Sequence, residues 1–277
     1  MRITSTFFGA ACSLAAVLSP AAAGPNMADA SAPPLASHKA LYDLRLVDGV
    51  GTKAPASASG RIAFDFSSAC EGYAQTLRQV VDMQPQEGER QITETRTATY
   101  EGLKGDGFRF NIATQGGKGE EVDGHAERDA RGALAIALNR PQPFKLNAAN
   151  DVLFPTQHIE KVIDAARRGE KILLARVYDA SDDGRKIFNV TAIIGKARET
   201  PDSDKGAQTD ILRGLRRWPV ALAYFPSNLR DGQPDYVLSF DLYENGVSSD
   251  LKLDYGDFVL TGELTDIAFP PAAKCRQ

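Results

Sequence analysis

The sequence predicts a mainly β fold, built from antiparallel strands, with one substantial α-helix at about residues 157–168. Three observations support this prediction. Apolar and polar side chains alternate with a period of two along most of the chain. The pair Asn245-Gly246 has the composition of a tight hairpin turn. Strands and helices do not alternate as they would in a parallel α/β sheet, so that class is disfavoured.

The first 23 residues are predicted to form a secretory signal peptide. Arg2 supplies the positive start, and the apolar run from Phe7 to Leu18 is too short to span a bilayer. Small residues then precede a cleavage site between Ala23 and Gly24. The alternative is an N-terminal core helix, but nothing amphipathic supports it. Residues 24–38, rich in Ala, Pro and Ser, are predicted to be a flexible lead-in to a single domain over residues 39–277.

The sequence has three cysteines, and the predicted signal peptide explains the odd number. Cys12 is removed with the signal peptide, which leaves Cys70 and Cys275. An exported protein meets an oxidising compartment, so the simplest prediction is one disulfide between them. It would close a loop of about 200 residues and stabilise the fold by at most about 5 kcal/mol. The alternative is two free, buried cysteines.

Charge and hydropathy exclude two classes of function. With 32 basic and 36 acidic residues the formal net charge is -4, which gives no basic field for binding nucleic acid. No long apolar segment follows the leader, so we expect the mature protein to be soluble and not membrane-spanning.

The alternation marks five strands before the helix, at residues 42–46, 62–66, 91–100, 108–112 and 134–138. In the third of these, threonine occupies every second position from Thr93 to Thr99. A β-branched polar face of this kind is typical of a solvated strand surface.

The helix is predicted from apolar residues at helical spacing between Ile159 and Ala166. Thr156 is a candidate N-cap, and Gly169 is a stop signal. The pair Arg167-Arg168 lies in the last turn, where the helix dipole favours basic side chains.

The remaining strands are predicted at residues 171–179, 185–194, 236–242, 251–255 and 257–269, for about a dozen in all. A turn at Ser181–Gly184 joins the first two. Asn245-Gly246 joins a later pair, as a type I′ turn with positive φ at both central residues. The polar residues 197–208 are predicted to be a mobile loop.

Few residues suggest catalysis or metal binding. The chain has three histidines, His38, His125 and His158, and no paired-His or CxxC motif. His125 lies between Asp123 and Glu127, which could be a metal site but fits the exposed face of one strand better. No G-x-S-x-G elbow is present. We therefore predict no catalytic residues, no cofactor and no metal, with a hydrolase using His158 or His125 as an alternative.

Three further motifs have simpler interpretations as structure. Gly116–Gly119 lacks the lysine and helix of a phosphate loop, so a turn is favoured. Asp179–Gly184 begins like a calcium loop, but its twelfth position is Val190 rather than glutamate, so a hairpin turn is favoured over weak calcium binding. The basic cluster Arg213, Arg216 and Arg217 could contact an anionic lipid or phosphate, although a solvated strand face is favoured, and Trp218 beside it is expected to be packing.

Several ordered motifs together resemble the EipB family of alphaproteobacterial cell envelope integrity proteins, over nearly all of the mature chain. They are Ser37–Leu44, Cys70–Tyr73, Phe154–His158, Val177–Asp179, Asp182–Gly184, Ala192–Lys196, Tyr243–Val247 and Leu253–Phe258.

The resemblance implies a periplasmic protein whose long antiparallel sheet curls into a broad spiral or open barrel around a helix. It implies a disulfide at Cys70 and Cys275, no catalytic residues, and association with a periplasmic tetratricopeptide-repeat protein. We therefore predict a non-enzymatic periplasmic protein that maintains envelope integrity and stress resistance. The alternative is a carrier or binder of lipid or lipoprotein, since a concave apolar face can hold a lipid chain or a partner peptide.

Overall fold

The computed structural model describes residues 35–49, 54–116, 119–199, 211–227 and 232–271. The predicted signal peptide, its cleavage site at Ala23-Gly24 and Cys275 lie outside these ranges, as does most of the predicted loop at 197–208. The predictions made for those residues therefore stay predictions.

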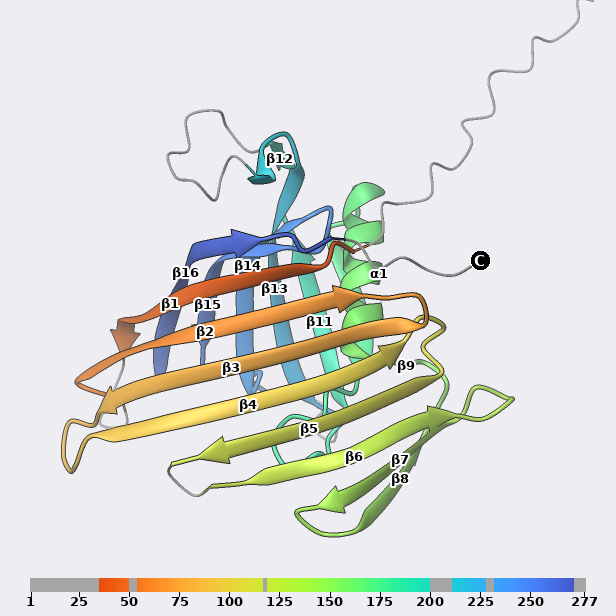
Figure 1. Ribbon diagram of the computed structural model, residues 1–277, viewed down its shortest axis with the longest axis horizontal. Helices are drawn as coiled ribbons and strands as arrows, with labels where there is room; N and C mark the ends of the chain where they lie inside the picture. Colours follow the sequence, from red (N-terminus) through yellow and green to blue (C-terminus); the bar gives the residue numbers. More distant parts are fainter. Residues whose placement is uncertain (1–34, 50–53, 117–118, 200–210, 228–231, 272–277) are drawn as a thin grey trace, which may run out of the picture. The chain divides into compact units, whose positions relative to one another are not determined.

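Sixteen strands make up the sheet within the described residues (Figure 1). Before the helix these are β1 (His38–Gly49), β2 (Ser57–Ser68), β3 (Gly72–Gln84), β4 (Gln91–Gly102), β5 (Gly107–Gln115), β6 (Glu121–Arg128), β7 (Leu134–Arg140), β8 (Phe144–Ala148) and β9 (Val152–Leu153). Helix α1 (Pro155–Arg167) follows. After it come β10 (Ile172–Val177), β11 (Phe188–Ile194), β12 (Arg198–Glu199), β13 (Arg216–Pro226), β14 (Tyr236–Tyr243), β15 (Ser248–Asp254) and β16 (Phe258–Ala268).

The order of the strands explains why the sheet is curled. Neighbours in sequence are mostly neighbours in the sheet, and β1 pairs with β16, which leaves β8 and β9 as the two ends. Only residues 149–151 separate β8 from β9 in the chain. Four Cα–Cα steps reach at most about 15 Å, so the two ends of the sheet must lie close together. This confirms the predicted fold class, an antiparallel sheet curled into an open barrel around a helix.

Arg128, at the end of β6, holds the crossing between the two ends. Its Nε donates to the carbonyl of Gly105 at 2.7 Å, and its Nη atoms donate to the carbonyls of Asn150 and Val152. The guanidinium also lies 5.0 Å from the ring centroid of Phe154. One side chain thus donates to carbonyls of two segments, the turn between β4 and β5 and the chain that leads into β9.

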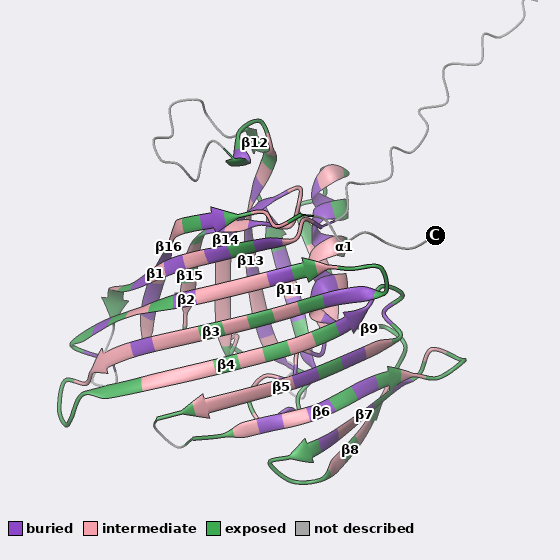
Figure 2. Ribbon diagram, in the orientation of Figure 1, coloured by how far each residue is buried: buried purple, intermediate pink, exposed green. Residues whose placement is uncertain are grey.

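The apolar core joins α1 to the inner face of β11, β13 and β14. The buried face of the helix, including Val162, Ile163 and Ala166, packs against Val190, Leu222, Phe240 and their neighbours. Figure 2 shows buried stretches of α1 in purple. Each fully buried aliphatic side chain contributes roughly 1.5–3 kcal/mol. A second cluster lies on the inner face of β5, β6 and β7, where Phe108 and Phe110 pack against Phe154 and Tyr178.

The ends of α1 differ from the prediction at the N-terminus and agree with it at the C-terminus. Phe154 is the N-cap residue and Pro155 the first helical residue, so the expectation that Thr156 caps the helix is wrong. Proline fixes φ at a helical value and needs no N–H partner at the first helical position. The helix therefore starts at Pro155, earlier in the chain than predicted. Gly169 has φ +77°, and its N–H donates to Ala166 while that of Glu170 donates to Ala165, as in a Schellman motif.

Three further expectations are corrected. Residues Leu35 to His38, predicted as flexible lead-in, are ordered: Leu35 is buried, and β1 begins at His38. The hairpin at Asn245-Gly246 is confirmed, but only Gly246 has positive φ (+90°), which fits a three-residue loop rather than a type I′ turn. The row Thr93–Thr99 is half-buried on the inner face, opposite Gln75, Leu77 and Gln79, rather than on a solvated surface.

The crossing held by Arg128 yields a stability prediction. Arg128→Met should lower the free energy of unfolding by about 2–4 kcal/mol, because hydrogen bonds from a charged group are lost and carbonyls stay unpaired. The matched control Arg96→Met removes an exposed arginine and should cost less than about 1 kcal/mol. Urea unfolding checks both; equal losses would show that Arg128 does not hold the crossing.

Candidate functional site

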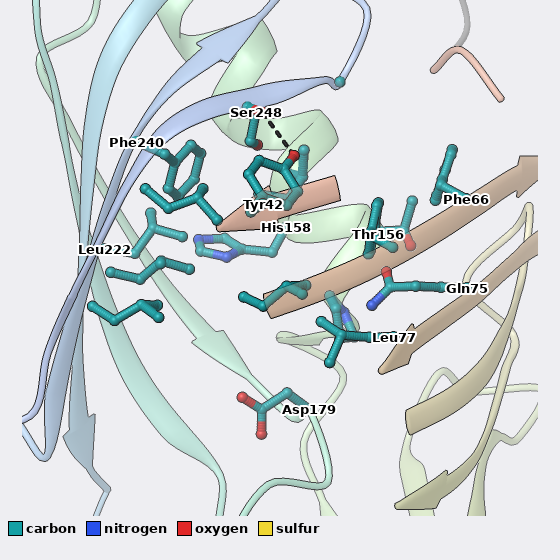
Figure 3. A pocket seen from close by; sticks show the side chains of 18 of the residues that line it. Tyr42, Phe66, Gln75, Leu77, Thr156, His158, Asp179, Leu222, Phe240 and Ser248 are labelled. Carbon is teal, nitrogen blue, oxygen red and sulfur yellow. Dashed lines mark hydrogen bonds between the residues drawn. The ribbon is translucent and has the colours of Figure 1, made fainter. Parts of the chain in front are cut away.

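The curled sheet and α1 enclose a cavity of about 330 Å³ (Figure 3). Its walls come from β1–β3, from the N-terminal turn of α1 and from β13–β15. The apolar lining is Leu35, Ile62, Phe64, Phe66, Leu77, Pro155, Ile159, Val177, Leu222, Tyr224, Leu238, Phe240, Gly246, Leu251 and Leu253. The polar lining is His38, Tyr42, Gln75, Gln79, Thr156, His158, Asp179 and Ser248.

The cavity has the chemistry of a small-molecule site. Such sites are mostly apolar, carry a few polar groups and begin at about 300 Å³. An apolar cavity of about 150 Å³ accepts benzene, so this one has room for roughly a dozen non-hydrogen atoms. An unbranched apolar chain with one polar group would match both its size and its lining.

Glu101, at the end of β4, fixes the helix beside the cavity. Its Oε2 accepts the Thr156 N–H and its Oε1 the Gln157 N–H, each at 2.8 Å, so a carboxyl from another strand satisfies two first-turn amides of α1. The first turn of α1 has no acidic residue of its own. Glu101 is 2% exposed, and its burial raises the pKa to about 7 despite these hydrogen bonds. The sequence prediction missed this residue, although it continues the alternation that begins at Thr93.

His158 lines the cavity from the first turn of α1, and Figure 3 shows its ring among the lining side chains. The side chain is 1% exposed, and burial lowers its pKa to about 4, so the ring is neutral at pH 7. Among the described residues, Nε2 has no hydrogen-bond partner. A histidine acting as general base needs a nucleophile within hydrogen-bond distance, and none in this part of the chain hydrogen-bonds to Nε2.

Asp179 follows β10 at another wall of the cavity. Its Oδ1 accepts the Ser181 backbone N–H at 3.0 Å and the Ser181 hydroxyl at 2.7 Å, and its Oδ2 accepts the Tyr236 hydroxyl at 3.2 Å. Burial raises the pKa of this carboxyl. The Ser181 contacts are internal to the turn, whereas the Tyr236 hydroxyl comes from β14. The structure agrees with the turn predicted at Ser181–Gly184, where the Gly184 N–H donates to Ser181.

Two further polar groups of the lining are tied to backbone atoms. His38 Nδ1 donates to the Ala36 carbonyl at 2.7 Å, and burial lowers the pKa of the ring. The Tyr42 hydroxyl donates to the Ser248 carbonyl at 2.8 Å. The first contact is local to the residues that lead into β1, and the second ties β1 to β15.

The remaining candidate residues lie apart from the cavity. His125 and Glu127 are exposed on β6, as predicted for a bare strand face. No cluster of metal-ligating side chains occurs among the described residues.

Arg216 is exposed and Trp218 is buried, as expected. Arg217 is half-buried and lies 3.4 Å from Asp241, which corrects its assignment to a solvated face. Cys70 lies in the turn between β2 and β3, far along the sequence from Cys275.

In the described part of the chain, no helix is long and apolar enough to cross a bilayer.

Comparison with known proteins gives consistent results. A family model described as EipB-like matches residues 29–271. The cell envelope integrity protein EipB of Brucella abortus (strain 2308) is 34% identical over 242 residues, which cover 86% of this chain and 85% of that protein. A crystal structure of a beta-barrel-like protein of a domain of unknown function, also from Brucella abortus, aligns with a TM-score of 0.78 at 32% identity, over 86% of this chain and 99% of the other.

The raised pKa of Glu101 predicts a pH dependence of stability. The folded protein binds the proton of the Glu101 carboxyl more tightly than the unfolded chain does. The stabilisation that this proton gives is complete below about pH 4.5 and is lost as the pH rises through 7. When the pH is raised from 5 to 8, the wild type should therefore lose about 2–3 kcal/mol of unfolding free energy relative to Glu101→Gln.

The matched control for this measurement is Glu263→Gln, an exposed carboxyl on β16. It should track the wild type at both pH values in chemical unfolding. A Glu101→Gln difference that is constant with pH would refute the assignment.

Proposed function

Because the chain belongs to the EipB-like family, we propose that it is a non-enzymatic protein of the periplasm that maintains the integrity of the cell envelope and resistance to envelope stress. The observation that carries the proposal is the match itself: the family model spans residues 29–271, nearly the whole region after the predicted signal peptide. The relative named for envelope integrity is matched over most of its length.

The predicted export signal fits this location. Cleavage between Ala23 and Gly24 would release the chain from residue 24 into an oxidising compartment, where Cys70 and Cys275 would pair. Such a bond would tie the turn after β2 to the residues beyond β16 and resist unfolding of the sheet during envelope stress. A periplasmic tetratricopeptide-repeat protein is the partner that the family resemblance suggests.

Binding of a single lipid chain, free or on a lipoprotein, is the second candidate function. The cavity supports it, because about 330 Å³ of mostly apolar space beside α1 is unlike the close packing of an ordinary core. The polar groups at its wall, among them Gln75 and His158, would contact the polar end of such a ligand.

The envelope role predicts a phenotype. Deleting the gene should sensitise cells to detergent and to antibiotics that act on the cell wall, and the full-length chain should restore growth. Variants that keep the fold but change both His158 and His125 to alanine should complement equally well. A deletion strain with unchanged sensitivities contradicts the role. Failure of the histidine variants alone would favour a function that uses these side chains, either in catalysis or as ligand contacts.

The lipid candidate predicts a bound mass. Protein purified gently from its own periplasm should carry a lipid adduct in native mass spectrometry. Leu238→Trp, which fills the cavity, should abolish the adduct, whereas Val237→Trp on the outer face of the same strand should retain it. Adduct-free wild-type protein across gentle preparations would argue against this function and leave the envelope role standing.

A further inference from the structure

Strand β10 is an open edge of the sheet over most of its length. It pairs with β11 along all six residues, from Ile172 to Val177. On its other side β9 pairs only with Arg176 and Val177. Within the part of the chain that the structure describes, residues 172–175 therefore have a ladder partner on one side only.

The backbone groups of this edge have a defined direction. The Ile194 N–H donates to the Lys171 carbonyl, so residues 171, 173 and 175 present their backbone groups to β11. The Tyr178 N–H donates to Leu153 in β9, so even-numbered residues face the opposite way. The N–H and C=O groups of Ile172 and Leu174 consequently point out of the sheet.

The same two residues are the most exposed large apolar side chains of the described residues. Leu174 is 73% exposed and Ile172 is 61% exposed, and Ile193, directly across the ladder on β11, is 55% exposed. The alternate residues Leu173 and Ala175 pack inward against the cluster around α1. The edge thus presents an apolar outer face beside unpaired backbone groups.

Strand β8, at the other end of the sheet, is protected against pairing with another chain, and β10 is not. Edge strands normally carry charges, prolines or bulges that prevent pairing with another chain. On β8 the exposed positions are Lys145 and Asn147, and Pro143 precedes the strand. Residues 172–175 contain no charge or proline, and their ladder with β11 has no bulge.

We propose that the β10 edge binds an extended segment of a partner protein by β-strand addition. The segment would carry apolar residues at alternate positions, lying over Ile172, Leu174 and Ile193, and would pair its backbone with Ile172 and Leu174. This surface lies on the outer face of the sheet and goes beyond the envelope role and the lipid cavity.

Charge indicates what flanks the apolar part of that segment. Lys171 is exposed at the start of the edge and makes no ion pair with the described residues, so an acidic side chain of the partner would complement it. The alternative occupant, a second copy of this chain, would show itself as self-association of the wild type that Leu174→Pro abolishes. The chain's own lead-in contains Pro25, Pro33 and Pro34, which cannot donate to a ladder.

The test uses the full mature chain and a phage-displayed library of random eight-residue peptides. We expect enriched peptides with apolar residues at alternate positions next to an acidic residue. Leu174→Pro removes only the outward N–H, because the β11 ladder does not use it, and should weaken binding at least tenfold without changing the melting temperature by more than a few degrees. N-methylation of the peptide at the residues facing the edge should weaken binding equally.

Two variants complete the design. Leu174→Lys places a charge on the edge and should also weaken binding at least tenfold, which keeps the test valid if the proline variant misfolds. Val47→Lys, at a comparably exposed apolar residue of β1, should change binding less than twofold. The proposal is overturned if no peptide family is enriched on the wild type relative to Leu174→Pro, or if the enriched peptides show helical spacing. It is also overturned if the wild type self-associates and Leu174→Pro does not.

Discussion

The structure depends on one topological constraint: the two end strands of the sheet, β8 and β9, are separated by only three residues of chain. A flat sheet of this many strands would hold its ends far apart, so the sheet has to curl until they meet. Helix α1 begins directly after β9 and packs on the concave side of the sheet. Arg128 secures the crossing, and Glu101 secures the start of the helix that follows it.

The cavity is a consequence of this arrangement. The helix fills the concave side against β11, β13 and β14, while the facing part of β3 and β4 carries Gln75, Gln79 and the threonine row, which cannot complete an apolar core. Space remains between the two sides, apolar where the strands near α1 contribute and polar where β3 does. The proposed envelope role of this chain would then use two separate sites, the cavity for a hydrophobic molecule and the β10 edge for another protein.

Much of the fold could be predicted from the sequence because period-two alternation and turn residues are local signals. Ten of the strands, the helix and the stop at Gly169 follow from such signals, whereas β3 was not among the predicted strands. The start of α1 was misplaced because Pro155 and a carboxyl from β4, rather than Thr156, satisfy its first turn. The threonine row was assigned to solvent because alternation identifies two faces but not which one is concave.

The cavity itself could not be predicted. It depends on contacts between β1–β3 and β13–β15, which are far apart in sequence, and the buried state of His158 follows only from that packing. Glu101 left a weak signal, as the one acidic residue continuing the inward-facing alternation of β4. The open edge at β10 left none, because it results from β9 pairing with only two residues.

Glu101 anchors α1 inside the curled sheet and so defines the cavity. Hydrogen exchange at the Thr156 and Gln157 amides tests it most directly, because first-turn amides of a helix ordinarily lack partners. We expect both amides to exchange only through global unfolding, and Glu101→Ala to accelerate both while the amides of β11 stay protected. Fast exchange of the two amides in the wild type, as in a frayed helix end, would contradict it.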